Sequence, residues 1–394
     1  MSKLRDVVIV SGARTPIGDF GGSFKDVMAV DLGVVAAKEA IRRAGIDPAT
    51  LDDVVVGSCM MRSDEINPAR CISLKAGVPF TTPAVTIQRQ CSSSMQALVF
   101  GVQQIQTGEN DCVLIGGVES MSNVPYILKG ARWGLRMKHG EITDALWEGL
   151  EDPLGHYMMG ITAENLAEKY AITRAQQDEL AFTSHQRAIA AIDAGRFKHE
   201  IVPVEIAQRK GPALVIDTDE HPRRNLTLEG LAKLPAAFKK EGTVTAGNAS
   251  GINDGACFAV IMSAERAQQL GVTPLARIVS HAAAGVEPEL MGYGPVPASR
   301  KALQRAGLAV GDVQLWEINE AFAAQYLACE KLLELDRARV NANGSGIALG
   351  HPVGCTGLRL VVSLVNEMQK RDLKLGAASL CVGGGMGKTV IVER

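Results

Sequence analysis

The 394-residue chain has few aromatic residues, no long apolar run and almost no excess charge of either sign. Aromatic residues make up 4%, which leaves little for stacking on nucleic-acid bases. Lysine and arginine total 41 against 43 aspartates and glutamates, a net charge of −2. No segment approaches the roughly 18 uninterrupted apolar residues of a membrane helix. These absences argue against nucleic-acid binding and against a membrane role.

Cysteine is present, but its spacing excludes its two common structural uses. Eight cysteines over this length, with no Cys-x-x-Cys pair, fit neither a disulfide framework nor a zinc site. The first residues offer no signal-peptide core, and Val392-Glu393-Arg394 is not a peroxisomal tail. We therefore expect a reduced, cytoplasmic protein that holds neither a metal nor a resident cofactor.

The chain repeats a helix, a closing glycine and a buried strand about 262 residues apart. The first copy is the helix 38–46 with the strand 53–57, and the second is the helix 300–308 with the strand 313–318. In both copies apolar residues recur at helical spacing, and a β-branched run follows the glycine. The two copies indicate two homologous halves.

A second strand–helix–strand unit also occurs twice. Its predicted elements are strand 83–87, helix 92–107 and strand 111–117, then strand 340–342, helix 356–370 and strand 377–384. Cys91 follows the first strand of one copy, and His351 follows the first strand of the other. Helices that alternate with buried strands predict mostly parallel sheets covered by helices on both faces.

The stretch between the halves has no counterpart elsewhere in the chain. We predict an N-terminal half from 1–119 and 248–272, an inserted loop domain over 120–247, and a C-terminal half over 273–394. Thr173-Arg174-Ala175-Gln176 is a capping-box pattern that begins a predicted helix ending at Gly195.

Two thiols and one imidazole lie in small-residue turns that suit covalent acyl chemistry at sulfur. Cys91 precedes Ser92-Ser93-Ser94 at a predicted helix start, where free N–H groups favour a thiolate. Cys381 precedes a glycine run that begins at Gly383 and permits close backbone approach to a ligand. His351 stands between Gly350 and Pro352. A buried structural cysteine and a polar core histidine are the competing interpretations.

Further segments join these residues in a recognisable series. They are Ser11-Gly12-Ala13-Arg14-Thr15-Pro16-Ile17-Gly18, the Cys91 segment, Gly242-Thr243-Val244-Thr245-Ala246-Gly247-Asn248-Ala249-Ser250-Gly251, Asn319-Glu320-Ala321-Phe322, the His351 turn and the Cys381 glycine run. Together they resemble the thiolase family along the whole chain. The resemblance implies a five-layer αβαβα fold of two pseudo-symmetric halves with a loop domain. It also implies a homodimer or homotetramer.

The resemblance further implies a ping-pong exchange of acyl groups between coenzyme A thioesters. By this likeness Cys91 carries the acyl group, His351 takes the proton of its thiol, and Cys381 moves the α-proton of acetyl-CoA. One oxyanion site would use His351 with a water held by Asn319, and the other the N–H groups of Cys91 and Gly383. The implied contacts to coenzyme A and the acyl chain are Ser250, Arg223, Met158, Met159, Met291, Ala321 and Phe322.

One position departs from part of the family. Acetoacetyl-CoA thiolases commonly show Tyr-His-Met-Gly where this chain has Tyr157-Met158-Met159-Gly160. A flexible apolar side chain in place of imidazole makes a pocket more adaptable, which favours longer 3-ketoacyl chains.

Two alternatives to a thiolase stay open at this point. A condensing synthase that uses acyl carrier protein would be expected to have a histidine or asparagine in place of Cys381. A non-catalytic lipid- or acyl-CoA-binding relative would be expected to lack Cys91 or His351. All three residues are present here.

Overall fold

The computed structural model describes residues 4–394, and its centre is one ten-stranded sheet. The strands follow the order β12-β13-β14-β11-β1-β10-β5-β3-β4, and β2 pairs with β10. Their bounds are β1 Val7–Arg14, β2 Gly18–Asp19, β3 Asp53–Gly57, β4 Ala84–Ile87, β5 Cys112–Ser120, β10 Asn253–Ser263, β11 Ala276–Gly285, β12 Leu315–Ile318, β13 Leu375–Val382 and β14 Met386–Glu393.

The two halves of this sheet repeat one strand order. The series β3-β5-β10-β1 in the first half matches β12-β13-β14-β11 in the second, and β1 meets β11 in the middle. That junction is antiparallel and short, with Val8 opposite Arg277 and Ile9 opposite Ala276. The predicted pair of homologous halves is therefore confirmed.

The prediction of mostly parallel pairing was wrong. Among the described residues, parallel pairing is confined to β3 with its two neighbours β4 and β5, and to β12 with β13. The last strand of each half, β10 or β14, runs antiparallel to both of its neighbours. In the second half a short turn over 383–385 joins β13 to β14, and a hairpin connection requires antiparallel strands.

The predicted strand 340–342 was also wrong, because only Val340 forms a bridge, to Trp316. Asn341 has a φ of 50°, which leaves the extended region of the backbone. Its side chain then bonds the N–H and the carbonyl of Ile318 at 2.8 Å each. Arg187 donates to the Val340 carbonyl at 2.7 Å. Side chains thus replace a regular strand at this edge.

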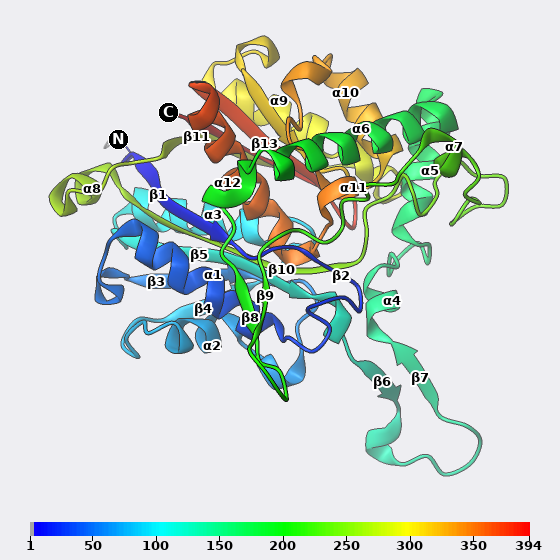
Figure 1. Ribbon diagram of the computed structural model, residues 1–394, viewed down its shortest axis with the longest axis horizontal. Helices are drawn as coiled ribbons and strands as arrows, with labels where there is room; N and C mark the ends of the chain where they lie inside the picture. The colour runs from blue at the N-terminus through cyan, green and yellow to red at the C-terminus, as the bar shows by residue number, and fades with distance from the viewer. Residues whose placement is uncertain (1–3) are drawn as a thin grey trace.

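Helices complete five layers, which Figure 1 shows stacked from top to bottom. The outer layers are α9 and α10 on one side and α1 and α2 on the other, and α12 packs on α3 between the two sheet halves. Their bounds are α1 Ala29–Ala44, α2 Pro68–Lys75, α3 Ser93–Thr107, α8 Ala264–Leu270, α9 Pro295–Ala306, α10 Ala323–Leu333, α11 Gly346–Leu349 and α12 Val353–Arg371. The αβαβα fold predicted from the sequence is confirmed.

Three large apolar cores occupy the spaces between these layers. The central core joins α3 and α12 to strands of both halves and includes Met95 and Leu358. A second core lies under α1 and α2, and a third lies under α9 and α10. Cys91 packs at the edge of the central core, and Cys381 belongs to the third.

The residues between β5 and β10 form elements outside the repeated pattern. They are β6 Tyr126–Lys129, β7 Glu141–Asp144, α4 Ala145–Gly149, α5 Met159–Tyr170, α6 Arg174–Asp193, β8 Val204–Ile206, β9 Leu214–Ile216 and α7 Leu228–Ala232. The predicted helix and its capping box at Thr173 and Gln176 are present in α6. The β6–β7 hairpin extends away from the body of the molecule (Figure 1).

Candidate active site

Cys91 lies in a tight turn between β4 and α3. Gln90, just before it, has a φ of 45°, an uncommon conformation for a residue with a side chain. The Ser92 and Ser93 N–H groups close the turn onto the carbonyls of Arg89 and Gln90, both at 3.0 Å. The turn leaves the Cys91 side chain half-buried at the mouth of the helix.

His351 lies in the equivalent turn of the other half, between Val340 and α12. Its N–H donates to Asn253 Oδ1 on β10 at 2.9 Å. The preceding Gly350 has a φ of 97°, and a Cβ there would stand 2.6 Å from Asn253 Cγ, so only glycine fits. The imidazole Nδ1 lies 2.7 Å from Thr356 Oγ1.

The two turns are tied together through Ser94, in the first turn of α3. Its hydroxyl donates to the Cys355 carbonyl at 3.0 Å and accepts the Leu358 N–H at 2.9 Å. Both partners belong to the N-terminal part of α12. The turns that carry Cys91 and His351 are therefore held side by side in the central layer.

Cys381 and Gly383 come from the end of β13. The Gly383 N–H lies near enough to the Cys91 sulfur to favour negative charge on it. Cys381 is fully buried, and its thiol is close enough to that of Cys91 for their charges to interact. The structure thus brings the two predicted thiols and the predicted N–H donor together.

Asn319 follows β12 and reaches the same place. Its N–H donates to the Ser379 carbonyl at 2.9 Å, two residues before Cys381. Its Nδ2 lies 3.5 Å from each ring nitrogen of His351, which is long for a direct bond. Within residues 4–394 the buried Asn319 Oδ1 has no protein partner. This acceptor lies beside Gly346, where a Cβ would stand 2.5 Å from it, and a buried polar atom of this kind requires a partner such as a water.

The resting protonation states differ from those expected from the sequence. Burial raises the pKa of Cys91, and the N–H groups of Gly383 and of Cys91 itself oppose that shift. Burial also raises the pKa of Cys381 well above its ordinary value. The expected thiolate at Cys91 was wrong, because desolvation outweighs the effect of the helix N-terminus. Burial and the nearby charge of Arg359 lower the pKa of His351 to about 3, which keeps it neutral.

Glu119, at the end of β5, is a site residue that was not predicted from the sequence. Its buried carboxylate accepts the N–H groups of Cys59 and Met60, both at 3.1 Å, and of Gly354 at 2.8 Å. Gly354 lies in the first turn of α12, so Glu119 joins the Cys59 loop of one half to the His351 turn of the other. Burial raises the pKa of Glu119 to about 7. A carboxylate at the end of a buried strand was the one sequence feature that could have marked it as a candidate site residue.

The segments expected to hold coenzyme A meet on the side of the inserted residues. The Ser250 N–H donates to the Ala321 carbonyl at 2.9 Å, and Ala249 forms a bridge with Phe322. Met159, Met291, Ala321 and Phe322 pack in one apolar core. The structure therefore brings these predicted residues together.

Met158 and Arg223 stand apart from that group. The backbone of Met158 pairs with Glu151, and its side chain is half-buried. Arg223 is exposed, and its N–H donates to His185 Nδ1 at 3.1 Å. No contact between Arg223 and the thiols is present among the described residues.

A small apolar cluster lines one side of the nucleophile. Its buried members are Met121, Leu146 and Val353, and Cys91 packs against it together with Cys59, Met60, Val124, Leu150 and Ile252. An apolar wall beside Cys91 suits a hydrocarbon chain carried on that sulfur.

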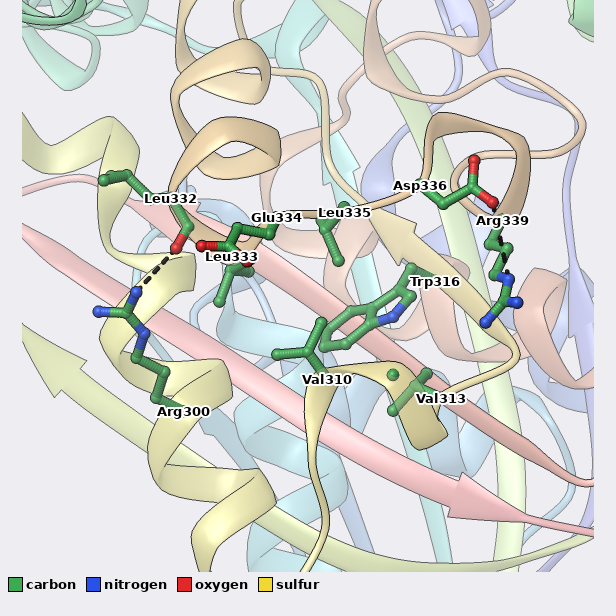
Figure 2. Close-up of a pocket in the computed structure, with 11 residues that line it drawn as sticks. Arg300, Val310, Val313, Trp316, Leu332, Leu333, Glu334, Leu335, Asp336 and Arg339 are labelled. Carbon is green, nitrogen blue, oxygen red and sulfur yellow. Dashed lines mark hydrogen bonds and ion pairs between the residues drawn. The ribbon is translucent and has the colours of Figure 1, made fainter.

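A separate cavity of about 370 Å³ lies on the outer face of the second half (Figure 2). Trp316 and Leu333 are among its apolar residues, and Arg300 and Arg339 stand at its ends. Arg300 donates to the Leu332 carbonyl at 2.7 Å, and Arg339 pairs with Asp336 at 3.7 Å. None of the residues that line this cavity belongs to the predicted site.

Among residues 4–394, no helix has the length and apolar character needed to cross a bilayer. All eight cysteines are free thiols.

Comparison with known proteins agrees with this geometry. Residues 7–265 match the family model "Thiolase, N-terminal domain", and residues 272–394 match "Thiolase, C-terminal domain". An acetyl-CoA acetyltransferase of Pseudomonas aeruginosa is 49% identical over 392 residues, covering 99% of this chain and 100% of the relative.

Solved structures give the same answer. The acetyl-CoA acetyltransferase of Bacillus anthracis superposes with a TM-score of 0.98 at 53% identity and covers 100% of both chains. Human mitochondrial 3-ketoacyl-CoA thiolase in complex with CoA has a TM-score of 0.95 at 46% identity, covering 99% of this chain and 98% of the other. This chain belongs to the thiolase family, and it is an acyltransferase of the thiolase type.

Proposed function

We propose that the enzyme interconverts 3-ketoacyl-CoA plus CoA with acyl-CoA plus acetyl-CoA, through an acyl thioester on Cys91. The observation that carries this proposal is the meeting of the Cys91 sulfur, the Gly383 N–H, Cys381 and the His351 turn at the junction of α3, α12 and β13. One nucleophile and two proton-transfer groups at one point are what such an exchange requires.

In the first half of the reaction the Cys91 sulfur attacks the 3-keto carbon and His351 takes the thiol proton. Because the pKa of Cys91 is raised, attack at neutral pH needs this neighbouring base. The Gly383 and Cys91 N–H groups hold the oxyanion that forms. The bond between carbons 2 and 3 then breaks, and Cys381 gives a proton to the acetyl-CoA carbanion.

In the second half a CoA thiol gives its proton to the Cys381 thiolate left by the first half, and its sulfur attacks the acyl group on Cys91. The new acyl-CoA leaves, and Cys91 recovers its proton from His351. His351 and a water held by Asn319 would hold the enolate oxygen of acetyl-CoA, and the unpaired Asn319 Oδ1 supports a polar group there. Condensation follows the same steps in reverse.

Coenzyme A is the proposed substrate, and no resident cofactor or metal is assigned. Ser250 and the exposed Arg223 are proposed to contact its pantetheine and nucleotide parts. Met158, Met159, Met291, Ala321 and Phe322 are proposed to line the acyl and pantetheine path, which their shared apolar core supports for the last four.

We also propose a cytoplasmic enzyme, which its eight free thiols support, and a homodimer or homotetramer. The β6–β7 hairpin exposes Tyr126, Ile127, Trp133, Met137 and Ile142, an apolar surface that a second copy would cover. The halves 1–119 with 248–272 and 273–394, and the inserted domain 120–247, remain our proposed boundaries.

The test is a thiolysis assay across 3-ketoacyl-CoA chain lengths, with mass spectrometry of the enzyme trapped by acyl-CoA. We expect turnover and one acyl group on Cys91. Cys91→Ser should bind CoA normally and form no acyl-enzyme, since a hydroxyl is a far weaker nucleophile. The matched control is Cys71→Ser, a half-buried thiol in α2. Acylation that persists in Cys91→Ser would refute the assignment.

A further inference from the structure

A directional chain of hydrogen bonds ends on the imidazole of His351. The Thr356 hydroxyl donates its only hydrogen to the Pro352 carbonyl at 2.9 Å. The same oxygen lies 2.7 Å from His351 Nδ1. A hydroxyl has one hydrogen and two lone pairs, so this oxygen can only accept from the ring. With the hydroxyl hydrogen on the Pro352 carbonyl, the hydrogen between Thr356 and the ring stands on Nδ1.

From this chain we infer that Thr356 is a positioning residue that fixes the tautomer of His351, leaving Nε2 as the only free base. This inference rests on the proposed function, because it matters only if His351 takes a proton from Cys91. A neutral imidazole has one donor and one acceptor nitrogen, so a hydrogen held on Nδ1 reserves Nε2 for the incoming proton.

The location of Thr356 makes this role effective. It lies in the first turn of α12, five residues after His351, and both are buried, with Thr356 fully inaccessible. The Pro352 carbonyl cannot turn away, because the N–H groups of Cys355 and Thr356 also bond to it at 3.0 Å each. Because the Pro352 carbonyl is fixed, the Thr356 hydroxyl that bonds to it is fixed too. The hydroxyl in turn fixes the orientation of the imidazole ring.

The surroundings leave the other nitrogen without a competing strong partner. Asn319 Nδ2 is 3.5 Å from His351 Nε2, too long to hold it firmly. After His351 takes the proton of Cys91, both nitrogens are donors: Nδ1 keeps its bond to Thr356, and Nε2 carries the transferred proton. That Nε2 hydrogen then returns to the Cys91 sulfur when the acyl group leaves it, so no proton passes through Thr356.

The test compares Thr356→Val with Thr356→Ser. Valine keeps the branched shape and removes the acceptor, whereas serine restores the oxygen and loses a methyl group. A histidine in the wrong tautomer costs up to about 10⁴-fold in rate. Because the threonine hydroxyl carries no charge, its loss should have a smaller effect than the loss of a carboxylate partner. We expect Thr356→Val to slow acylation of Cys91 by roughly 10- to 100-fold, and Thr356→Ser to react near the wild-type rate.

Two further measurements separate positioning from folding. Thr356→Val should bind CoA and melt as the serine variant does. Nitrogen-15 spectra of histidine-labelled enzyme should show the His351 hydrogen on Nδ1 in wild type and a changed tautomer in Thr356→Val, with the signal assigned from His351→Gln. A Thr356→Val enzyme that acylates at the wild-type rate, or a wild-type Nδ1 without hydrogen, would overturn the inference.

The proposed function can fail separately. If wild-type enzyme is not acylated on Cys91, the function is wrong whatever the tautomer. If wild type is acylated and both Thr356 variants are slowed equally, the function stands and the role of Thr356 falls.

Discussion

Each reactive side chain of the site is held neutral by its surroundings. Burial raises the pKa of Cys91 and of Cys381 and lowers that of His351. A neutral thiol beside a neutral imidazole places no isolated charge in the interior before substrate arrives. The N–H groups at Gly383 and at the starts of two helices then stabilise negative charge when it develops.

Removal of the second thiol should separate the two proton transfers. We expect Cys381→Ala to slow exchange of the α-proton of acetyl-CoA by roughly 10²–10⁴-fold, with a much smaller loss in acylation of Cys91. Exchange into deuterated water and quenched-flow acylation measure the two steps. Cys329→Ala, another buried thiol, is the control. Equal losses in both steps would contradict the division of roles.

The acyl pocket should respond to the residue at position 158. Met158→His places a polar, shorter side chain beside a pocket that is otherwise apolar, so preference should move toward acetoacetyl-CoA. We expect the ratio of thiolysis rates for long and short chains to fall about tenfold, as the loss of one or two buried methylene contacts would give. Leu270→His, at the exposed end of α8, is the control. A chain-length profile unchanged by Met158→His would place this residue outside the pocket.

For individual residues, the reactive side chains could be predicted from the sequence, but their burial and the resulting pKa shifts could not. Cys91, His351, Cys381 and Asn319 stand in turns of small residues that a reader can find. The direction of their pKa shifts depends on how completely the two halves enclose them, which no local pattern records. Thr356 was missed for the same reason, since a threonine in a helix becomes informative only when its partner is known.

Among the elements, α12 begins against a carboxyl group supplied by the other half. Glu119 on β5 accepts the Gly354 N–H at the start of this 19-residue helix. A carboxylate at a helix N-terminus bonds free N–H groups and is favoured by the helix dipole. The start of α12 and the loop at Cys59 therefore shift together if Glu119 changes.

The stability of the enzyme should depend on pH through Glu119. Its pKa of about 7 in the folded protein exceeds the ordinary 4.5, so the folded state binds more protons between these values. Its contribution is complete below pH 4.5 and is lost as pH rises through 7. The free energy of unfolding of Glu119→Gln does not depend on pH in this way. The wild type should therefore exceed the variant in free energy of unfolding by more at pH 5 than at pH 8, with a change of up to about 3 kcal/mol.

Thermal unfolding at fixed protein concentration across pH 5–8 measures this difference. Glu168→Gln is the matched control, because its ion pair with Lys239 is exposed. A constant gap between wild type and Glu119→Gln over the whole range would show that this carboxylate does not titrate there.

Helices and buried strands were predictable at this scale, and pairing direction was not. Glycine stops and capping residues marked α3, α6 and α9 within a few residues. The direction of β10 depends on the inserted segment that precedes it. The sequence of that segment does not indicate in which direction the strand enters the sheet. The strand predicted at Val340 is absent partly because Arg187, 153 residues away in the sequence, bonds to the Val340 carbonyl.

Across the whole molecule, a buried lysine joins the two halves. Lys388 on β14 donates to Gln96 Oε1 on α3 at 2.8 Å and is 3% exposed. Burial, with the charges of Arg89 and Arg305, lowers its pKa to about 7. An ammonium group has three hydrogens, and this one has a single protein partner among the described residues.

Replacement of this lysine should therefore stabilise the enzyme near neutral pH. The depressed pKa means that the unfolded chain binds more protons between pH 7 and 10.5, so stability rises with pH in that window. We expect Lys388→Met to raise unfolding stability at pH 6 by about 1–3 kcal/mol and to gain nothing at pH 10. Denaturant unfolding at both pH values measures this, with exposed Lys301→Met as control. An equal effect at both would refute the prediction.

The repeated strand order has a chemical consequence. Cys91 and His351 occupy matching positions, each before the helix that its half contributes to the middle layer. Two identical halves would set one thiol opposite another, or one imidazole opposite another, and neither pairing combines an attacking atom with a proton acceptor. The pairing of an attacking atom with a proton acceptor therefore depends on the difference between the two copies at this one position.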